Sequence, residues 1–184
     1  MLFISDTQEA LEAAVDLVNT LPSGSDPDAL ATADDVERFL ETHPYTGRIT
    51  HDERERAALR GIRSRIAELW DVERDDAVPL VNAMLRDGRA LPQLAIHDGY
   101  DWHVHATDPE APLATRILVE TGMAFVDVIR ADQYARIRRC SADDCDRAYI
   151  DFSKNGSKRY CDTGNCGNRM NVNAYRSRRA RENS

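Results

Sequence analysis

The sequence predicts a mainly α protein with one β-hairpin (α+β): a helical N-terminal domain followed by a small, treble-clef-like four-cysteine finger. Three observations support this fold class. Apolar residues repeat at helical spacing through most of residues 8–130. One segment, near residues 92–106, alternates apolar and polar side chains around an Asp-Gly turn. All four cysteines lie within residues 140–166.

Five helices are expected before the cysteine-rich segment, because apolar residues recur there at intervals of three and four. The fourth begins near Pro79, since proline suits the first turn of a helix. The fifth has the broadest apolar stripe, so we expect it at the centre of the core. The expected ranges are residues 8–19, 34–41, 52–72, about 79–86 and 111–130.

Two asparagines are candidate ligand contacts. Asn19 ends the first helix, and its simpler interpretation is that it satisfies backbone groups at that end. Asn82 lies among the apolar residues of the fourth helix. There it would either fasten a neighbouring loop or face a small-molecule cavity.

The segment of residues 92–106 predicts a hairpin with one apolar and one polar face. Val104 alternates with His103 and His105, and His97 lies near the turn. Three histidines are chemically able to hold a metal ion. We favour exposed histidines on the solvent face, because no carboxylate or cysteine spacing reinforces a metal site. A pH-sensitive contact with a ligand or partner stays open.

The cysteines form two CxxxxC pairs of identical spacing. Cys140 and Cys145 make the first pair, Cys161 and Cys166 the second, and fifteen residues separate them. Between the pairs, the sequences AYIDF and SKRY are expected to be strands joined by an Asn-Gly turn, which would bring the pairs together. Four thiolates make a closed tetrahedral site for one structural Zn²⁺ ion. Disulfides, an iron-sulfur cluster and free thiols are the alternatives.

Four thiolates around one Zn²⁺ leave a formal charge of −2, which nearby cations would offset. Arg139, Arg147 and Arg169 are the expected cations. Gly167 directly follows the last cysteine and is expected to allow a close backbone approach or a strained turn.

The CxxxxC pairs, the YIDF sequence, the basic turn and Cys-Gly-Asn-Arg at residues 166–169 occur together within residues 137–181. In these features the segment resembles the CGNR zinc finger, although Tyr160 stands where a tryptophan is expected. That finger usually follows an ABATE domain in bacterial stress-induced transcription regulators. Upstream, the resemblance rests on the sequence VNTL, which contains Asn19, and on the helix around Asn82. It implies an ABATE-like domain over residues 1–135 and a CGNR-type finger with a basic C-terminal helix over residues 136–184.

Charge is divided unevenly along the chain. The net charge of −8 by itself argues against nucleic-acid binding. Residues 136–184, however, carry twelve Lys and Arg against six Asp and Glu, whereas residues 1–135 carry twelve against twenty-six. This split suggests a DNA-binding finger on an acidic domain. The residues expected to contact DNA are Arg169, Arg176, Arg178, Arg179, Lys154, Lys158 and Arg159.

The basic C-terminal helix has a simpler interpretation. It would then be a solvated helix whose charge neutralises the zinc centre or docks on the acidic domain. The family resemblance favours DNA contact.

No catalytic motif is found: the sequence lacks a Walker loop, a dinucleotide-binding glycine signature, GxSxG and HExxH. We therefore expect no enzyme. The predicted function is a zinc-dependent, DNA-binding transcription regulator, whose helical domain senses a small-molecule effector or mediates homodimerisation. The alternatives are an interaction adaptor that binds protein or RNA, and a thiol-zinc redox sensor.

A cytoplasmic protein without a membrane span is expected. No apolar run approaches about 18 residues, the length that predicts a transmembrane helix. The N-terminal residues show no basic segment, apolar run or cleavage site of an export signal.

Overall fold

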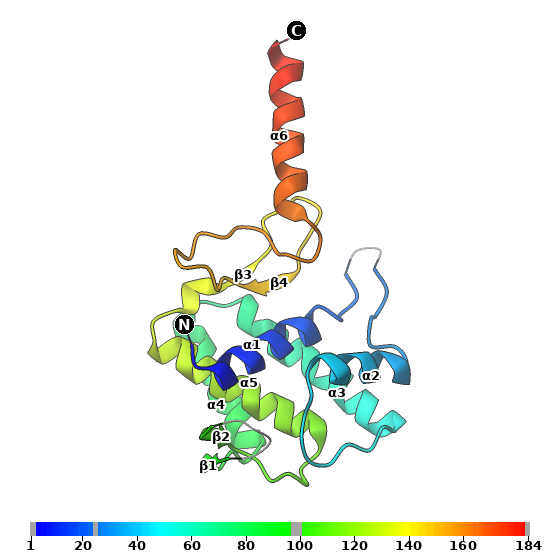
Figure 1. Cartoon of the computed structure of the whole chain (residues 1–184), viewed down its shortest axis with the longest axis vertical. Coiled ribbons are helices and arrows are strands. Elements are labelled where there is room, and N and C mark those ends of the chain that lie inside the picture. The colour runs from blue at the N-terminus through cyan, green and yellow to red at the C-terminus, as the bar shows by residue number, and fades with distance from the viewer. Residues whose placement is uncertain (1–2, 24–25, 97–100, 183–184) are drawn as a thin grey trace.

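The computed structural model describes residues 3–23, 26–96 and 101–182. Residues 3–135 form a mainly helical body, and residues 136–182 form a small finger from which a long helix extends away from the body (Figure 1). This arrangement confirms the predicted fold class. The helices of the body are α1 (Ser5–Val18), α2 (Ala33–Thr42), α3 (Glu53–Ala67), α4 (Arg74–Asp87) and α5 (Leu113–Arg130). Its strands are β1 (Gln93–Ala95) and β2 (His103–His105), and the finger contains β3 (Ile137–Arg139), β4 (Ala148–Ile150) and α6 (Cys166–Glu182).

Local sequence explains where several helices begin. Thr32 starts α2 with a capping box, in which its side chain and that of Asp35 accept hydrogen bonds from each other's backbone N–H groups. The prediction that α4 begins near Pro79 is wrong, because α4 begins at Arg74 and contains Pro79. Two acidic residues in its first turn favour the earlier start, and the missing N–H of proline removes only one backbone hydrogen bond.

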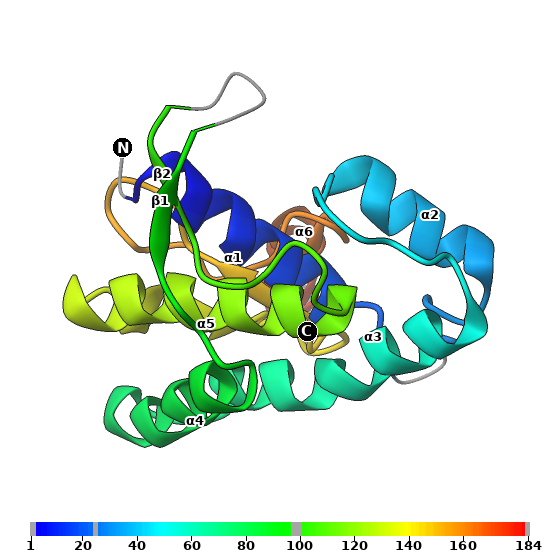
Figure 2. The ribbon, with the colours of Figure 1, turned by 90° about the horizontal axis from the view of Figure 1, so that it is seen from below.

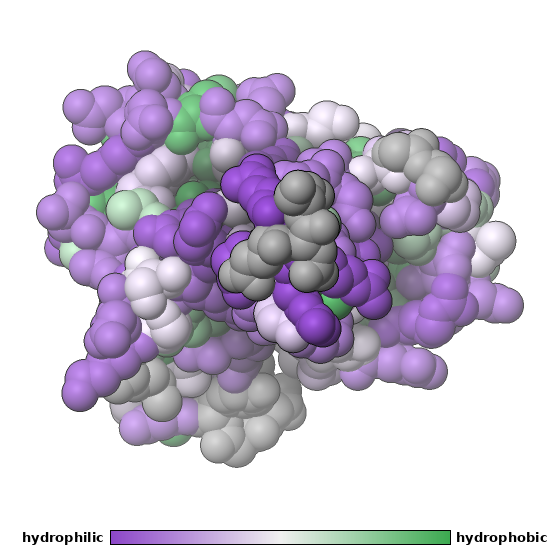
Figure 3. Space-filling model, turned by 90° about the horizontal axis from the view of Figure 1, so that it is seen from above, coloured by the Kyte–Doolittle hydropathy of each residue, from purple (hydrophilic) through white to green (hydrophobic). Residues whose placement is uncertain are grey.

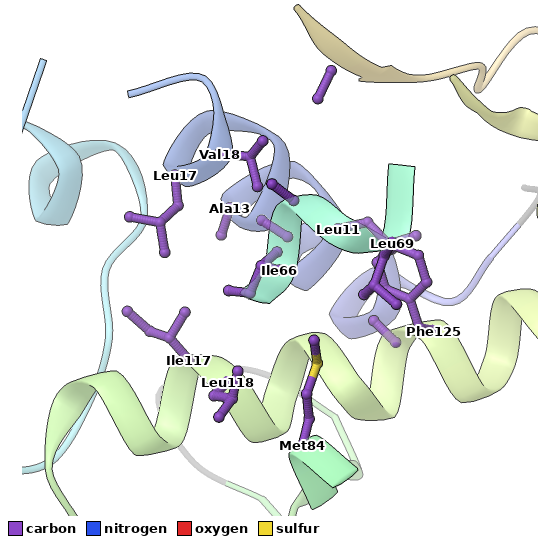
Figure 4. Packing of buried hydrophobic residues seen from close by; sticks show 14 of the residues in the cluster. Leu11, Ala13, Leu17, Val18, Ile66, Leu69, Met84, Ile117, Leu118 and Phe125 are labelled. Atoms are coloured by element: carbon purple, nitrogen blue, oxygen red, sulfur yellow. The ribbon is translucent and has the colours of Figure 1, made fainter. Parts of the chain in front are cut away.

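The core lies where α1, α3, α4 and α5 meet. Figure 4 shows side chains from these helices converging, among them Leu11 of α1, Ile66 of α3, Met84 of α4 and Phe125 of α5, which are all fully buried. The helix α5 packs against α1, α3 and α4, so its predicted place at the centre of the core is confirmed. Burial of such large apolar side chains stabilises the body by about 1.5–3 kcal/mol each.

The strands of the finger belong to the same core as the body. Ala148 and Ile150 of β4 are buried in the main hydrophobic cluster. The indole Nε1 of Trp70 donates a hydrogen bond to the carbonyl oxygen of Tyr149 at 3.1 Å. These contacts hold one side of the finger firmly against the body.

The hairpin of β1 and β2 lies at the end of the body opposite to α6 (Figures 1 and 2). Its strands pair as predicted, with Leu94 opposite Val104. The predicted faces are wrong: the side chain of Leu94 is 68% exposed, whereas His103 and His105 are half-buried. The histidines instead line a groove along α1, whose wall carries several carboxylates beside apolar side chains. The Asp-Gly turn and the residue at position 97 lie outside the described residues.

Candidate metal centre and nucleic-acid interface

The four cysteines come together from two places in the finger. Cys140 and Cys145 lie in the loop between β3 and β4, where the backbone N–H of Cys145 donates to the carbonyl of Ala142. Cys161 precedes a short turn, and Cys166 is the first residue of α6. All four Sγ atoms lie within 4.8 Å of one another. They form the one group of potential metal ligands found among the described residues.

The spacing of the sulfur atoms fits a tetrahedral ion. The Sγ of Cys161 lies 3.8 Å from that of Cys145 and 3.7 Å from that of Cys166. Zinc-sulfur bonds of about 2.3 Å in tetrahedral geometry place sulfur atoms about 3.8 Å apart. The site therefore can hold one zinc ion.

Burial keeps the thiols of Cys145 and Cys161 protonated unless a cation lies among the cysteines. Burial raises the pKa of Cys145 to about 12 and raises the pKa of Cys161. Burial acts on Cys140 in the same direction, but backbone N–H groups of Cys161 and Ala142 donate to its sulfur and lower its pKa. Four crowded thiols lose their protons together only when a positive charge lies among them. A divalent ion such as zinc supplies that charge.

Among the three arginines expected to offset the thiolate charge, Arg169 lies at the site. Its Nη2 donates to the Sγ of Cys166 at 3.2 Å and to the carboxylate of Asp144 at 2.9 Å. The other two face the body instead, because Arg139 pairs with Asp71 and Arg147 with Asp26. These two arginines thus bind the finger to the acidic body.

The glycine that the site needs is Gly164, which sequence reasoning missed. A Cβ atom at Gly164 would lie 3.1 Å from the Sγ of Cys166, so a larger residue would crowd the sulfur. Gly167 lies in the first turn of α6, where a Cβ would be in ordinary contact with the ring of Tyr160. The expected strained turn at Gly167 is therefore wrong.

The hairpin predicted between the cysteine pairs is also wrong. The strand β4 covers the first half of that segment, but its partner is β3 rather than residues 157–160. The buried carboxylate of Asp151 accepts hydrogen bonds from the backbone N–H groups of Ser153 at 2.9 Å and Lys158 at 2.7 Å. The segment therefore closes on a side chain instead of on a second strand.

Two arginines of the finger complete this loop, and sequence reasoning missed both. Arg136 donates to the carbonyl of Asp151 at 2.8 Å, and Arg138 donates to the carbonyls of Gly156 at 3.0 Å and Lys158 at 2.8 Å. The available signal was an aspartate between apolar residues in a segment rich in arginine. A guanidinium group carries five N–H donors in a fixed fork, so one arginine can bond to several backbone carbonyls of such a loop.

Two family models match the chain. One, described as CGNR zinc finger, matches residues 136–179. The other, described as ABATE, "Putative stress-induced transcription regulator", matches residues 11–132, which is more than half of the chain. The chain belongs to the ABATE family. The resemblance inferred from the Cys-Gly-Asn-Arg sequence is thereby confirmed, and the family description names a transcription regulator rather than an enzyme. No curated protein matches the chain.

In the CGNR finger, α6 carries most of the residues expected to contact DNA. Arg176, Arg178 and Arg179 are exposed, as is every residue from 171 to 181. Met170 packs on the cysteine cluster and holds the base of the helix. Seen from the end of α6, hydrophilic side chains surround the helix (Figure 3).

The basic residues outside α6 that are expected to contact DNA differ in how exposed they are. Lys154 and Arg159 are exposed, and Arg159 lies over the ring of Tyr160. Lys158 is half-buried, pairs with Asp162 and lies 5.7 Å from the ring centre of Tyr149. The structure therefore leaves Lys154 and Arg159 more open to a partner than Lys158.

The two asparagines of the ABATE domain lie in different surroundings. The side-chain amide of Asn19 donates to the carbonyl of Ala148 and accepts from its N–H, both at 2.9 Å. Asn19 thus satisfies backbone groups, as the simpler interpretation of the sequence expects. Those groups belong to the finger, however, and not to the end of α1. Asn82 is exposed on α4 and does not line the groove along α1.

A membrane crossing would need a long and mostly apolar helix. None of the described helices has that length and apolar character.

Proposed function

We propose that the chain is a zinc-dependent transcription regulator of the bacterial cytoplasm that inserts α6 into the major groove of DNA. The observation that carries this proposal is that α6 extends away from the body with most of its side chains exposed. Every residue of α6 from 171 to 181 is exposed, including Val172 and Tyr175, so this part of the helix buries no face against the body. Here that helix carries five arginines against one glutamate, which favours a polyanionic partner.

The dimensions of α6 suit a groove. Its 17 residues span about 25 Å, and the major groove is about 12 Å wide, enough to admit one helix. Arg169 and Arg176 share one face, being seven residues apart. Arg169 is engaged at the metal centre, so Arg176, with Arg179 close to that face, is the better candidate for base or phosphate contacts.

Zinc would act on DNA binding through the position of this helix. Cys166 begins α6, and Cys140, Cys145 and Cys161 anchor that first residue to the rest of the finger. The hydrogen bonds and core contacts of β4 then fix the finger relative to the body. A change in the body would therefore alter where α6 points, which supports a sensing role for the body.

The experiment is capture of fragmented genomic DNA from the source organism by the zinc-loaded protein. We expect a discrete set of fragments, with affinity that falls steeply as salt rises. Replacing Arg176, Arg178 and Arg179 by glutamine should lower affinity at least about tenfold. It should also reduce the salt slope by up to about three, one for each phosphate that the variant no longer neutralises.

The matched control replaces three exposed arginines of the body, Arg54, Arg86 and Arg89, by glutamine. This variant loses the same charge, so it should bind DNA as the parent does. Equal losses in both variants would mean that only net charge matters. If the parent retains no DNA at low salt with one zinc bound per chain, the proposal fails.

A further inference from the structure

A groove of about 1090 Å³ runs along α1. Its walls are formed by β2, α5, residues 42–46 and the part of the finger nearest to α1. This volume slightly exceeds the range of about 300–1,000 Å³ that is usual for small-molecule sites. Figure 2 shows how α1, α5 and the hairpin, which all contribute to the lining, lie relative to one another.

Two polar groups of the groove have no hydrogen bond within the described part of the chain. These are the carboxylate of Glu120 on α5 and the hydroxyl of Tyr45, which interact with each other electrostatically. Arg116 lies on the same helix as Glu120, but its guanidinium donates to the carbonyls of Thr46, Arg48 and Ala111. Glu120 is therefore left without an ion pair. Burial raises the pKa of its carboxyl group to about 7.

The groove has the electrostatic character of a cation site. Its lining from the body includes one arginine, Arg130, and a larger set of carboxylates. That set comprises Asp6, Glu9, Glu12, Asp16, Glu120 and Asp127. An anionic ligand would be repelled, whereas a cation would be attracted and would provide the partner that Glu120 lacks.

The lining of the groove fits an organic cation better than a bare metal ion. Ala10, Ala13, Met123 and Ala124 form an apolar part of the lining. Among the described residues, only the four cysteines form a group that could hold a metal ion, so Glu120 belongs to no such group. A ligand that uses both the carboxylate and the apolar wall is an organic ammonium compound.

We propose that this groove binds a small organic ammonium compound, whose charged nitrogen pairs with Glu120 and whose apolar part packs beside Tyr45 and Met123. The inference rests on the sensing role proposed above and deepens it, since it names the class of effector. His103 and His105 complete the wall from β2, which explains why the polar face of that hairpin turns inward.

The test uses three probes of similar size: 2-phenylethylammonium, neutral 2-phenylethanol and anionic 3-phenylpropionate. Binding to the full-length, zinc-loaded protein is measured by calorimetry without DNA. We expect the ammonium probe to bind at least about tenfold more tightly than either of the others, because neither of them can form the charge-assisted hydrogen bond. Equal binding of the three probes, or no binding of the ammonium probe at 10 mM (about 2.7 kcal/mol of affinity), overturns the proposal.

Variants locate the bound probe. Glu120→Gln keeps the shape of the side chain and should weaken ammonium binding at least about tenfold. Tyr45→Phe should weaken it less, and Glu41→Gln, at an exposed position outside the groove, should leave it unchanged. Thermal unfolding and circular dichroism establish that each variant is folded. Undiminished binding by folded Glu120→Gln overturns the site.

The two proposals fail separately, because this measurement contains no DNA. A protein that binds the probe but captures no DNA fragments would keep the groove and lose the regulator. A protein that captures fragments but binds no ammonium probe would keep the regulator and lose this effector class.

Discussion

The two small hairpins of this protein have the same size and opposite surroundings. Each consists of two antiparallel strands of three residues. In β4 all three residues are buried, whereas in β1 two of the three are exposed and none is buried. A two-stranded hairpin of this length is marginally stable in water, so what surrounds it decides its stability.

The hairpin of β3 and β4 gains its stability from three sources outside itself. Asn19 pairs with the backbone of Ala148, Trp70 pairs with that of Tyr149, and Ile150 enters the main core. The cysteine cluster closes the loop between its strands. In the described part of the hairpin of β1 and β2, by contrast, the apolar side chains of Leu94 and Trp102 are 68% and 64% exposed.

Removal of zinc should break this comparison most strongly. The double variant Cys161→Ser, Cys166→Ser should bind no zinc and lose the folded finger, because structural zinc contributes about 10 kcal/mol or more to the folding of small fingers. Zinc content and hydrogen exchange measure the outcome. Exchange should accelerate in β4 and stay unchanged in β2; unchanged protection of β4 would mean that the body alone holds that strand.

The second largest effect is expected from truncating one apolar side chain in each hairpin, which should destabilise the protein much more in β4 than in β2. Ile150→Ala removes a buried side chain of β4 and should lower the free energy of unfolding by about 2–5 kcal/mol. Val104→Ala, at a 39% exposed position in β2, should change it by no more than about 0.5 kcal/mol. Urea unfolding of both variants checks this, and similar losses would contradict the assigned faces.

The burial of Glu120, in the groove that β2 also lines, can be tested through pH. The pKa of Glu120 is about 7 in the folded protein and near 4.5 when unfolded, so the folded state binds more protons between these values. Stability from this group is therefore complete below pH 4.5 and is lost as pH rises through 7. Glu120→Gln should remove this loss and raise the free energy of unfolding at pH 8 by about 2–3 kcal/mol.

Urea unfolding between pH 5 and 8 measures this effect. The groups that interact electrostatically with Glu120 are Arg116 and Tyr45, and both proteins also share the other titratable groups of the groove. The difference between parent and variant thus isolates Glu120. Parallel pH profiles for the two proteins would show that this carboxylate is not buried in the folded state.

The smallest expected effect concerns the link between α1 and β4. Asn19→Ala leaves the N–H and carbonyl of Ala148 without their partner and should cost about 1–2 kcal/mol. Asn19→Asp retains the acceptor and loses the donor, so its cost should be no smaller, since the carboxylate then meets the carbonyl of Ala148. Thermal unfolding with hydrogen exchange of β4 gives the measurement; a neutral Asn19→Ala would remove this anchor from the comparison.

Sequence patterns predicted those parts of the site that depend on neighbours in the chain. The equal spacing of Cys140, Cys145, Cys161 and Cys166 identified the metal centre, because a chelating pair is a local feature. The partners of Asn19 could not be predicted in this way, since 129 residues separate it from Ala148. The exposure of Asn82 could not be predicted from the pattern either, because a polar residue among apolar ones can lie on the buried or on the exposed face of a helix.

The sequence by itself determined the helices, the charge division, the family and the zinc ligands, since periodicity, composition and ligand spacing are carried by short segments. Tertiary structure decided which face of β2 turns inward and which strand pairs with β4. It also decided that Asp151 closes a loop where Asn-Gly signals a hairpin. These outcomes depend on free energies of packing and hydrogen bonding between distant segments, which compete with local preferences of about the same size.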